Sequence, residues 1–245
     1  MYSDRFLLCL LGLLLSTCIW PDSVIAQSQP KQPVLPKDTL HKQLSLEHVP
    51  VGLKANRLIP EDSRLTAARV ALGRSLFFDP VLSENNTVAC ASCHQPLHGF
   101  AAPDARAIGI HGQFGLRNAP SLLNRAYGRR FFWDGRVGSL EEQALKPLAN
   151  PKELGSSVAA ALKRLRENAS YAEQFRQAFT TGGAEAVNAE NLGKALASFQ
   201  RTLLFGDSPV DRFRANDASA LSDAERQGLW LYESRGRCWR CHSGH

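Results

Sequence analysis

Apolar residues recur every three or four positions in several stretches of the chain, which is the spacing of one face of an α-helix. In the stretch 62–77 the residues at this spacing are Leu65, Ala68, Leu72 and Leu76. The stretches 156–167 and 188–204 are interpreted as helices in the same way. Alternation of Val, Ile and Thr, which would indicate strands, is nowhere sustained. The pattern therefore predicts an all-α fold.

Three further helix starts are indicated by a serine followed three residues later by a glutamate, which is the capping-box pattern. The pairs are Ser139 with Glu142, Ser170 with Glu173, and Ser222 with Glu225. Residues 27–50 differ from the rest, because four prolines stand there among polar residues. Such a segment is typical of an extended lead-in.

The first 26 residues have the layout of a secretory signal, with Arg5 before an apolar run at 6–19 and the small residue Ala26 at the end. The apolar run has 14 residues, fewer than the ~20 that a membrane-spanning helix needs. We predict cleavage after Ala26, export to the periplasm and no membrane span. A lipoprotein site at Cys18 is the alternative.

Charge and composition narrow the function classes. Loss of residues 1–26 removes one Arg and two Asp, which changes the formal net charge from +6 to +7. A moderately basic surface can steer an acidic partner, but no Lys and Arg run is dense enough to indicate a nucleic-acid groove. With 44% hydrophobic and 21% charged residues, the chain is a globular protein rather than a disordered or collagen-like one.

The four cysteines that follow the signal all belong to two copies of one motif, CASCH at 90–94 and CWRCH at 238–242. CxxCH is the pattern by which c-type haem is attached. The thiols Cys90, Cys93, Cys238 and Cys241 would form thioethers, and His94 and His242 would ligate the irons. Disulfides, a thioredoxin-like redox pair and a zinc site are alternatives for CxxC, but none requires a His after the second Cys in both copies.

A weak internal repeat precedes the two motifs, because residues 73–77 and 228–232 share the order small, apolar, aromatic. Turn residues at 206–209 interrupt the helical pattern between them. The predicted organisation is a signal at 1–26, an N-terminal haem domain with its lead-in at 27–205, and the start of a second haem domain at 206–245.

Four segments carry a resemblance to a known family. They are LGRSLFFD at 72–79, the first CxxCH, RNAPSLLN at 117–124, and FWDGR at 132–136 with the segment 140–147 after it. In this order they resemble the bacterial dihaem cytochrome c peroxidases and their MauG-like relatives. The resemblance implies two cytochrome c-like haem domains that reduce hydrogen peroxide to water. The electrons would come from a small periplasmic donor, a cytochrome c or a cupredoxin.

The resemblance also implies residue roles. Glu153 and Gln143 fall where the family has its distal catalytic glutamate and glutamine, and one carboxylate near the iron can both accept and return the peroxide proton. Trp133 would be the electron bridge between the haems, although its pattern alone indicates a core aromatic. His111 is the candidate for a loop His that blocks the peroxide face, with a surface His as the alternative. Asn118 matches a calcium ligand.

Only three residues follow His242, and the single Met is Met1. We therefore expect the second haem domain to be incomplete in this chain, as in a fragment or a truncated product. In the family the distal ligand of the second haem is Met in peroxidases and Tyr in MauG. Peroxide reduction is the leading prediction. A MauG-like oxidase of a protein or organic substrate and a non-catalytic dihaem electron carrier are the alternatives, and a homodimer is a further expectation.

Overall fold

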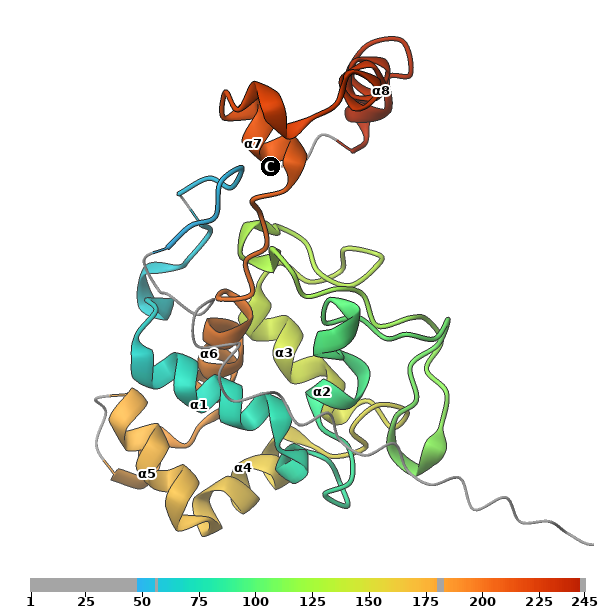
Figure 1. Cartoon of the computed structure of the whole chain (residues 1–245). Coiled ribbons are helices and arrows are strands. Elements are labelled where there is room, and N and C mark those ends of the chain that lie inside the picture. The colour runs from blue at the N-terminus through green and yellow to red at the C-terminus, as the bar shows by residue number, and fades with distance from the viewer. Residues whose placement is uncertain (1–47, 56, 180–182, 243–245) are drawn as a thin grey trace, which may run out of the picture. The chain divides into compact units, whose positions relative to one another are not determined.

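The computed structural model of the chain describes residues 48–55, 57–179 and 183–242, so the predicted signal and most of the lead-in lie outside the described residues. Within these ranges the fold is all-α, and the only β contacts are three isolated bridges. The α-helices are α1 (Ala67–Phe78), α2 (Cys90–Cys93), α3 (Leu140–Ala149), α4 (Val158–Glu167), α5 (Ala169–Ala178), α6 (Ala189–Gln200), α7 (Pro209–Arg214) and α8 (Asp223–Glu233), as Figure 1 shows. The short 3₁₀-helices are η1 (Glu61–Ser63), η2 (Pro80–Leu82), η3 (Pro96–His98), η4 (Ile110–Gly112), η5 (Arg125–Tyr127), η6 (Gly183–Ala186), η7 (Ala218–Ala220) and η8 (Cys238–Arg240).

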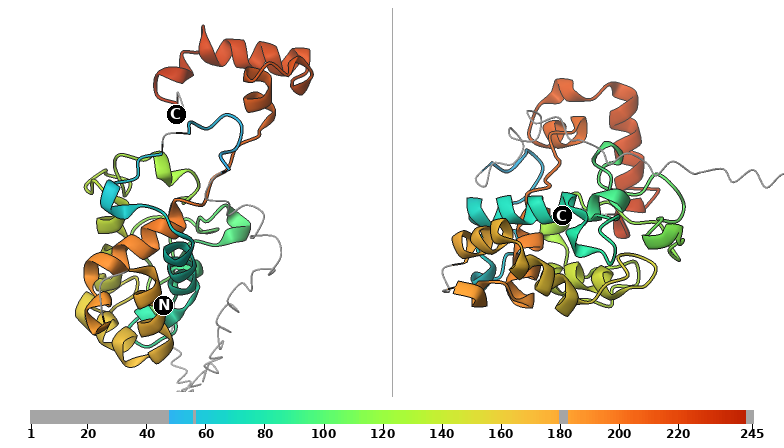
Figure 2. Two further views of the ribbon diagram at one scale, coloured as in Figure 1. Left: turned by 90° about the vertical axis from the view of Figure 1, so that its left-hand side faces the viewer. Right: turned by 90° about the horizontal axis from the view of Figure 1, so that it is seen from below.

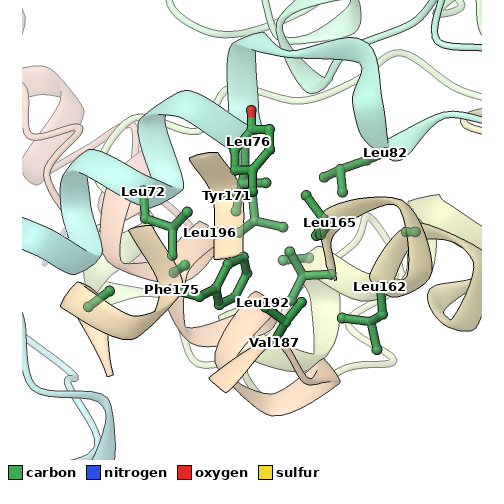
Figure 3. Packing of buried hydrophobic residues seen from close by; sticks show 14 of the residues in the cluster. Leu72, Leu76, Leu82, Leu162, Leu165, Tyr171, Phe175, Val187, Leu192 and Leu196 are labelled. Atoms are coloured by element: carbon green, nitrogen blue, oxygen red, sulfur yellow. The ribbon is translucent and has the colours of Figure 1, made fainter. Parts of the chain in front are cut away.

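Helices α1 and α6 form the centre of the packed region (Figures 1 and 2). Helix α1 also packs on α5, and α6 also packs on α3. Leu76, Leu165, Phe175 and Leu192 are fully buried in the core between these helices (Figure 3). Each such side chain stabilises the fold by about 1.5–3 kcal/mol relative to an exposed position, so these contacts fix the helices around the first haem motif.

Two glycines allow α6 to approach its neighbours closely. A Cβ on Gly73 of α1 would lie 1.9 Å from the backbone oxygen of Ala195, which is closer than any carbon atom can approach. A Cβ on Gly193 of α6 would lie 2.8 Å from the backbone oxygen of Glu141. Larger residues at either position would therefore push the helices apart.

The structure confirms two of the predicted helix starts. The Ser139 hydroxyl accepts a hydrogen bond from the backbone N–H of Glu142 at 3.2 Å, and α3 begins there. Ser222 and Glu225 form the reciprocal capping box at the start of α8.

The other helix predictions need correction at their ends. Helix α1 begins at Ala67 rather than Asp62, because Thr66 caps it and Asp62 belongs to η1. Helix α5 is capped by Asn168 and not by Ser170, since the Asn168 side chain accepts from the N–H groups of residues 170 and 171. Helices α4 and α6 lie inside the predicted stretches but are shorter.

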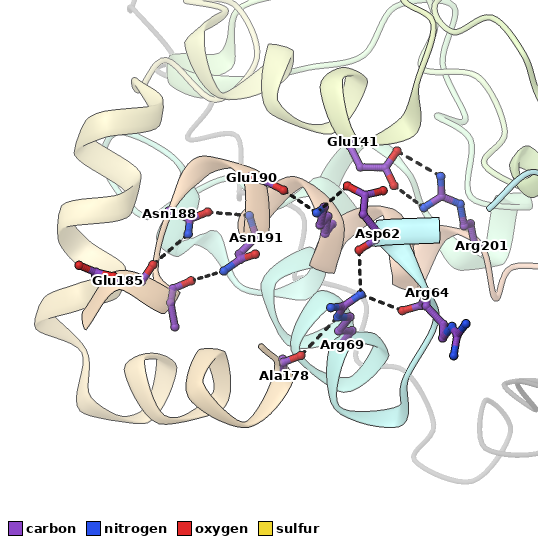
Figure 4. A network of polar contacts seen from close by, with 12 residues as sticks. Asp62, Arg64, Arg69, Glu141, Ala178, Glu185, Asn188, Glu190, Asn191 and Arg201 are labelled. Carbon is purple, nitrogen blue, oxygen red and sulfur yellow. Dashed lines mark hydrogen bonds and ion pairs between the residues drawn. The ribbon is translucent and has the colours of Figure 1, made fainter. Parts of the chain in front are cut away.

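A buried ion pair joins α3 to the end of α6 (Figure 4). Both terminal nitrogens of the Arg201 guanidinium donate to the Glu141 carboxylate, at 2.5 and 3.1 Å. The Arg201 side chain is only 3% exposed and that of Glu141 is 17% exposed. Burial alone would raise the pKa of Glu141, but the hydrogen bonds and charge of Arg201 outweigh it and lower this pKa.

Hydrogen bonds between side chains and backbone groups hold the chain segment that follows α6. The Asn124 side chain donates to the backbone oxygen of Phe205 and accepts from its N–H, both at 2.8 Å. Asp207 exchanges two hydrogen bonds with the backbone of Val51. The predicted boundary at 206–209 falls between α6 and α7 and stays a prediction.

Candidate haem site

The first CxxCH motif folds into one turn of helix. Cys90–Cys93 form α2, and the N–H of His94 donates to the backbone oxygen of Cys90 at 2.9 Å. This turn places both thiols on a single short element directly before the imidazole. Neither thiol is in a disulfide, and Cys90 packs against the aromatic cluster that contains Phe77 and Phe199.

The His94 ring is oriented by distant backbone carbonyls. Its Nδ1 lies 3.0 Å from the oxygen of Phe100 and 3.1 Å from that of Pro120, so Nδ1 carries the proton and donates it. The opposite nitrogen, Nε2, then keeps its lone pair for a metal. Burial lowers the pKa of His94 and favours the neutral imidazole, which is the form that ligates iron.

The two thiols are not built for redox exchange on their own. Burial raises the pKa of Cys90 to about 12, with a smaller contribution from Cys93. Burial followed by the negative charge of Glu153 raises the pKa of Cys93 to about 11. A thioredoxin-like cysteine needs a lowered pKa. Within the described part of the chain, no three or more His, Cys, Asp or Glu side chains are grouped so that they could hold a metal ion.

Glu153 lies on the turn after α3, close enough for its charge to act on both thiols. Asn150 donates from its side-chain nitrogen to Oε1 of Glu153 at 2.6 Å. Burial raises the pKa of Glu153, and the Asn150 hydrogen bond and the Arg136 charge only partly oppose this effect. The neutral carboxyl form is therefore favoured beside the haem motif, and the catalytic role of Glu153 stays a prediction.

The loop at residues 109–112, which contains His111, packs on the turn that carries Glu153. The N–H of Ile110 donates to the backbone oxygen of Glu153 at 2.9 Å. A Cβ on Gly109 would lie 2.1 Å from the backbone oxygen of Lys152, so only glycine permits this approach. The His111 ring itself lies 3.3 Å from the Glu84 carboxylate, and both side chains are more than half exposed. The structure thus brings the loop to Glu153, and the haem-blocking role of His111 stays a prediction.

Trp133 and Asn118 are joined directly. The indole N–H of Trp133 donates to the backbone oxygen of Asn118 at 2.9 Å. The Asn118 side chain in turn donates to the backbone oxygens of Ala102 and Asp104, at 2.9 and 2.7 Å. Trp133 is 62% exposed, so the interpretation of it as a core aromatic is wrong. The calcium role of Asn118 stays a prediction, with Oδ1 as the atom that a cation would bind.

Gln143 is half-buried in α3, where its N–H donates to the backbone oxygen of Ser139. In the described residues its side chain makes no hydrogen bond to Glu153 or His94. The structure therefore brings Glu153 to the haem motif without joining Gln143 to it.

Exposed apolar side chains next to the motif were missed by the sequence reasoning. They are Ile108, Phe114 and Leu116, with exposed fractions between 48% and 84%. The Cys93 thiol donates to the backbone oxygen of Ile108 at 3.5 Å, which places this loop at the motif. Apolar residues in a glycine-rich loop were the available signal. Two free thiols, an imidazole with Nε2 presented and nearby exposed apolar groups together fit a covalently attached haem.

The second motif forms a 3₁₀ turn, η8, rather than an α-helical one, and its surroundings also differ. The N–H of His242 donates to the backbone oxygen of Cys238 at 2.9 Å, and the Tyr232 hydroxyl donates to the backbone oxygen of His242. Cys238 and Cys241 are exposed, and Trp230 is 57% exposed. The predicted haem ligands of this motif are thus present on a short element against α8.

Among the described residues, no helix has the length and apolar character to cross a membrane.

Comparison with known proteins agrees with this geometry. The chain is 42% identical over 185 residues to the methylamine utilization protein MauG of Methylorubrum extorquens, which covers 75% of this chain and 52% of that protein. It is 38% identical over 173 residues to the cytochrome c551 peroxidase of Nitrosomonas europaea, covering 71% of this chain and 51% of the relative. The chain thus spans about half the length of these relatives.

A solved structure gives the same result at the level of the fold. A MauG-like protein associated with microbial copper homeostasis aligns with a TM-score of 0.70 and 31% identity, over 82% of this chain and 57% of that one. The family model described as di-haem cytochrome c peroxidase matches residues 67–219, which contain the first motif, Trp133 and Glu153. The chain therefore belongs to the di-haem cytochrome c peroxidase family, whose members include MauG.

Proposed function

We propose that this chain is the peroxide-reducing part of a dihaem cytochrome c peroxidase. The observation that carries the proposal is the Glu153 carboxyl, whose pKa burial raises and whose charge reaches both thiols of the first motif. An electron carrier has no use for a buried proton-carrying carboxyl beside its haem. The non-catalytic alternative is therefore disfavoured.

The reaction is H₂O₂ with two electrons and two protons giving two waters. The haem, when bound at Cys90 and Cys93 with His94 as its iron ligand, supplies the site at which the O–O bond is cleaved. Glu153 accepts the proton from the near peroxide oxygen and returns it to the leaving oxygen, which then departs as water. Asn150 keeps the carboxyl in place through the hydrogen bond to Oε1. Gln143 is proposed to orient the peroxide.

Electrons are proposed to enter at a second haem, held by Cys238, Cys241 and His242, and to pass Trp133. The hydrogen bond to the Asn118 backbone fixes the indole although much of its surface is exposed. The donor would be a small cytochrome c or cupredoxin, and the basic net charge of +6 fits an acidic donor surface. Export to the periplasm, a calcium ion at Asn118 and a homodimer belong to the same proposal.

A MauG-like oxidase is the second candidate. The specific observation in its favour is the 42% identity to MauG, against 38% to a cytochrome c551 peroxidase. Both reactions would use the same Glu153 chemistry at the first haem and would differ in what delivers the electrons. A Met as distal ligand of the second haem favours peroxide reduction, and a Tyr favours the oxidase.

The variant Glu153→Gln tests the proposal in the haem-loaded protein. It removes the proton carrier and keeps a polar side chain of similar size, so peroxide turnover should fall by about 10²–10⁴-fold. Glu142→Gln is the matched control, because that glutamate is exposed on α3 and pairs with Lys146. Haem content should be unchanged in both variants. Wild-type turnover by Glu153→Gln would remove Glu153 from the mechanism.

A further inference from the structure

An open cavity of about 370 Å³ lies outside the haem site, where the end of the lead-in meets η5 and the start of α3. The Leu58 N–H donates to the backbone oxygen of Ala126 at 3.0 Å and holds the lead-in there. Its lining includes the apolar side chains of Leu58, Ile59 and Phe131 and the guanidinium groups of Arg125, Arg129 and Arg201. Three of these residues are arginines and none is acidic, and Glu141 outside the lining compensates the charge of Arg201 alone.

The most buried of these arginines, Arg201, has one N–H group without a hydrogen-bond partner. Arg201 is 97% buried, and its two terminal nitrogens are engaged by Glu141 (Figure 4). Its third donor, Nε, is buried and has no hydrogen-bond partner. A buried N–H of a charged group without an acceptor destabilises the fold, and an incoming acceptor would remove this cost.

The other two arginines have no carboxylate partner among the described residues. Arg125 donates to the backbone oxygen of Arg130 at 2.8 Å, and its guanidinium carbon lies 5.1 Å from the centre of the Phe131 ring. Burial lowers the pKa of Arg125, as expected for a cation that no anion compensates. Arg129 is exposed and makes no ion pair within the described part of the chain.

The start of α3 adds further donors. This helix has 10 residues, and its first N–H groups have no acceptor within the helix. The Ser139 hydroxyl accepts from the Glu142 N–H and therefore has its own hydrogen available to donate. Helix N-termini carry partial positive charge, which adds to that of the arginines.

We propose that this cavity binds an oxyanion, with Arg201, Arg125, Arg129 and the start of α3 as its donors. Leu58, Ile59 and Phe131 also line the cavity, so the ligand would be a small organic acid whose apolar body lies against them. Carboxylate and phosphate oxygens share the required chemistry. A free inorganic anion and an organic acid are distinguished by the probes below. The site does not depend on the peroxide reaction, because none of its residues belongs to the haem site.

Calorimetric titration of the haem-loaded protein with sodium benzoate and, separately, with inorganic phosphate tests the proposal. We expect one binding event per chain, with no change in the haem absorption spectrum. Tighter binding of benzoate identifies an organic acid site, and tighter binding of phosphate identifies a site for inorganic oxyanions. Arg129→Gln should lower the affinity for the anion about tenfold, since a hydrogen bond to a charged group is lost.

Arg130→Gln is the matched control. It removes the same charge one residue along the chain, and its side chain does not line the cavity, while its backbone still accepts from Arg125. This variant should bind the anion as the wild type does. Absence of saturable binding of either anion up to about 10 mM, which is weaker than ordinary ligand affinities, would overturn the proposal. Equal weakening by both substitutions, or none by Arg129→Gln, would also overturn it.

Discussion

The two CxxCH motifs share one backbone hydrogen bond but differ in helix type and in their surroundings. In each, the N–H of the histidine donates to the backbone oxygen of the first cysteine at 2.9 Å. In the first motif the backbone carbonyls of Phe100 and Pro120 orient the imidazole through Nδ1, and no such contact to the His242 ring is present within the described residues. Cys90 packs against an aromatic cluster and Cys93 is half-buried, whereas Cys238 and Cys241 are exposed.

This difference separates what a motif encodes from what the fold adds. The spacing of CxxCH is sufficient for the turn that presents two thiols and an imidazole. Tautomer, burial and a nearby carboxyl come from residues far along the chain, as Pro120 and Glu153 show. The first motif packs on Phe77 of α1 and Phe199 of α6, whereas the second packs on α8.

The largest effect should come from breaking the buried ion pair of the first region. Arg201→Met leaves the Glu141 carboxylate buried without its partner, which should lower the free energy of unfolding by about 3–5 kcal/mol. Chemical denaturation of the haem-loaded protein measures this loss. The double variant with Glu141→Gln should recover part of it, because no charge is then left buried. An unchanged unfolding midpoint for Arg201→Met would contradict the packing described here.

Replacing each cysteine pair by serine compares the motifs directly. Each double variant should retain one covalent haem of two, as mass spectrometry of the denatured protein would show. Cys90→Ser with Cys93→Ser should also lower the unfolding free energy by about 1–3 kcal/mol, since hydroxyls enter an apolar cluster. The Cys238 and Cys241 substitutions should not add this cost, because those positions are exposed. Equal destabilisation would contradict the comparison.

Glu153 should make the first region pH-sensitive. Its pKa is raised by burial, so the ionised form is disfavoured in the folded state. The unfolding free energy should therefore decrease as pH rises from the ordinary carboxyl pKa through the raised one. Glu153→Gln removes this decrease and should be the more stable protein above that range. Thermal unfolding from pH 4 to pH 8 measures both curves, and parallel curves would show that Glu153 is not buried as described.

The exposed ion pair of Arg214 with Glu233 should matter least. It connects the end of α7 to α8, and both side chains are about half exposed. Surface pairs contribute at most about 1 kcal/mol, so Arg214→Met should change the unfolding free energy by less than this. A loss as large as that of Arg201→Met would mean that the second region is held by buried contacts.

Short sequence patterns predicted most of the helices, and the errors at the helix ends also come from neighbouring residues. The serine caps at 139 and 222 follow from a short pattern, and the structure has them. The prediction that Ser170 caps α5 was wrong because Asn168, two residues earlier, accepts hydrogen bonds from the first N–H groups of the helix. Helix α1 was predicted to start at Asp62 but starts at Ala67, because the spacing of apolar residues does not identify Thr66 as the cap.

The candidate site was predictable only where a motif or a resemblance names residues. The cysteines, His94 and Glu153 were found in this way, and the structure brings Glu153 to the first motif. The carbonyl partners of His94 could not be found, because a backbone oxygen has no sequence signature. The exposure of Trp133 was missed for a similar reason, since an aromatic residue between apolar neighbours has the pattern of a core position.

The central claim is that peroxide reacts at the haem of the first motif, and the two cysteine-to-serine variants test it most directly. Each is reduced and mixed with one equivalent of hydrogen peroxide, and the haem absorption is followed in a stopped-flow instrument. The account predicts that the variant lacking Cys238 and Cys241 still consumes peroxide rapidly, and that the variant lacking Cys90 and Cys93 does not. The opposite result, or equal reactivity of the two, would contradict the assignment of His94 and Glu153 to the peroxide site.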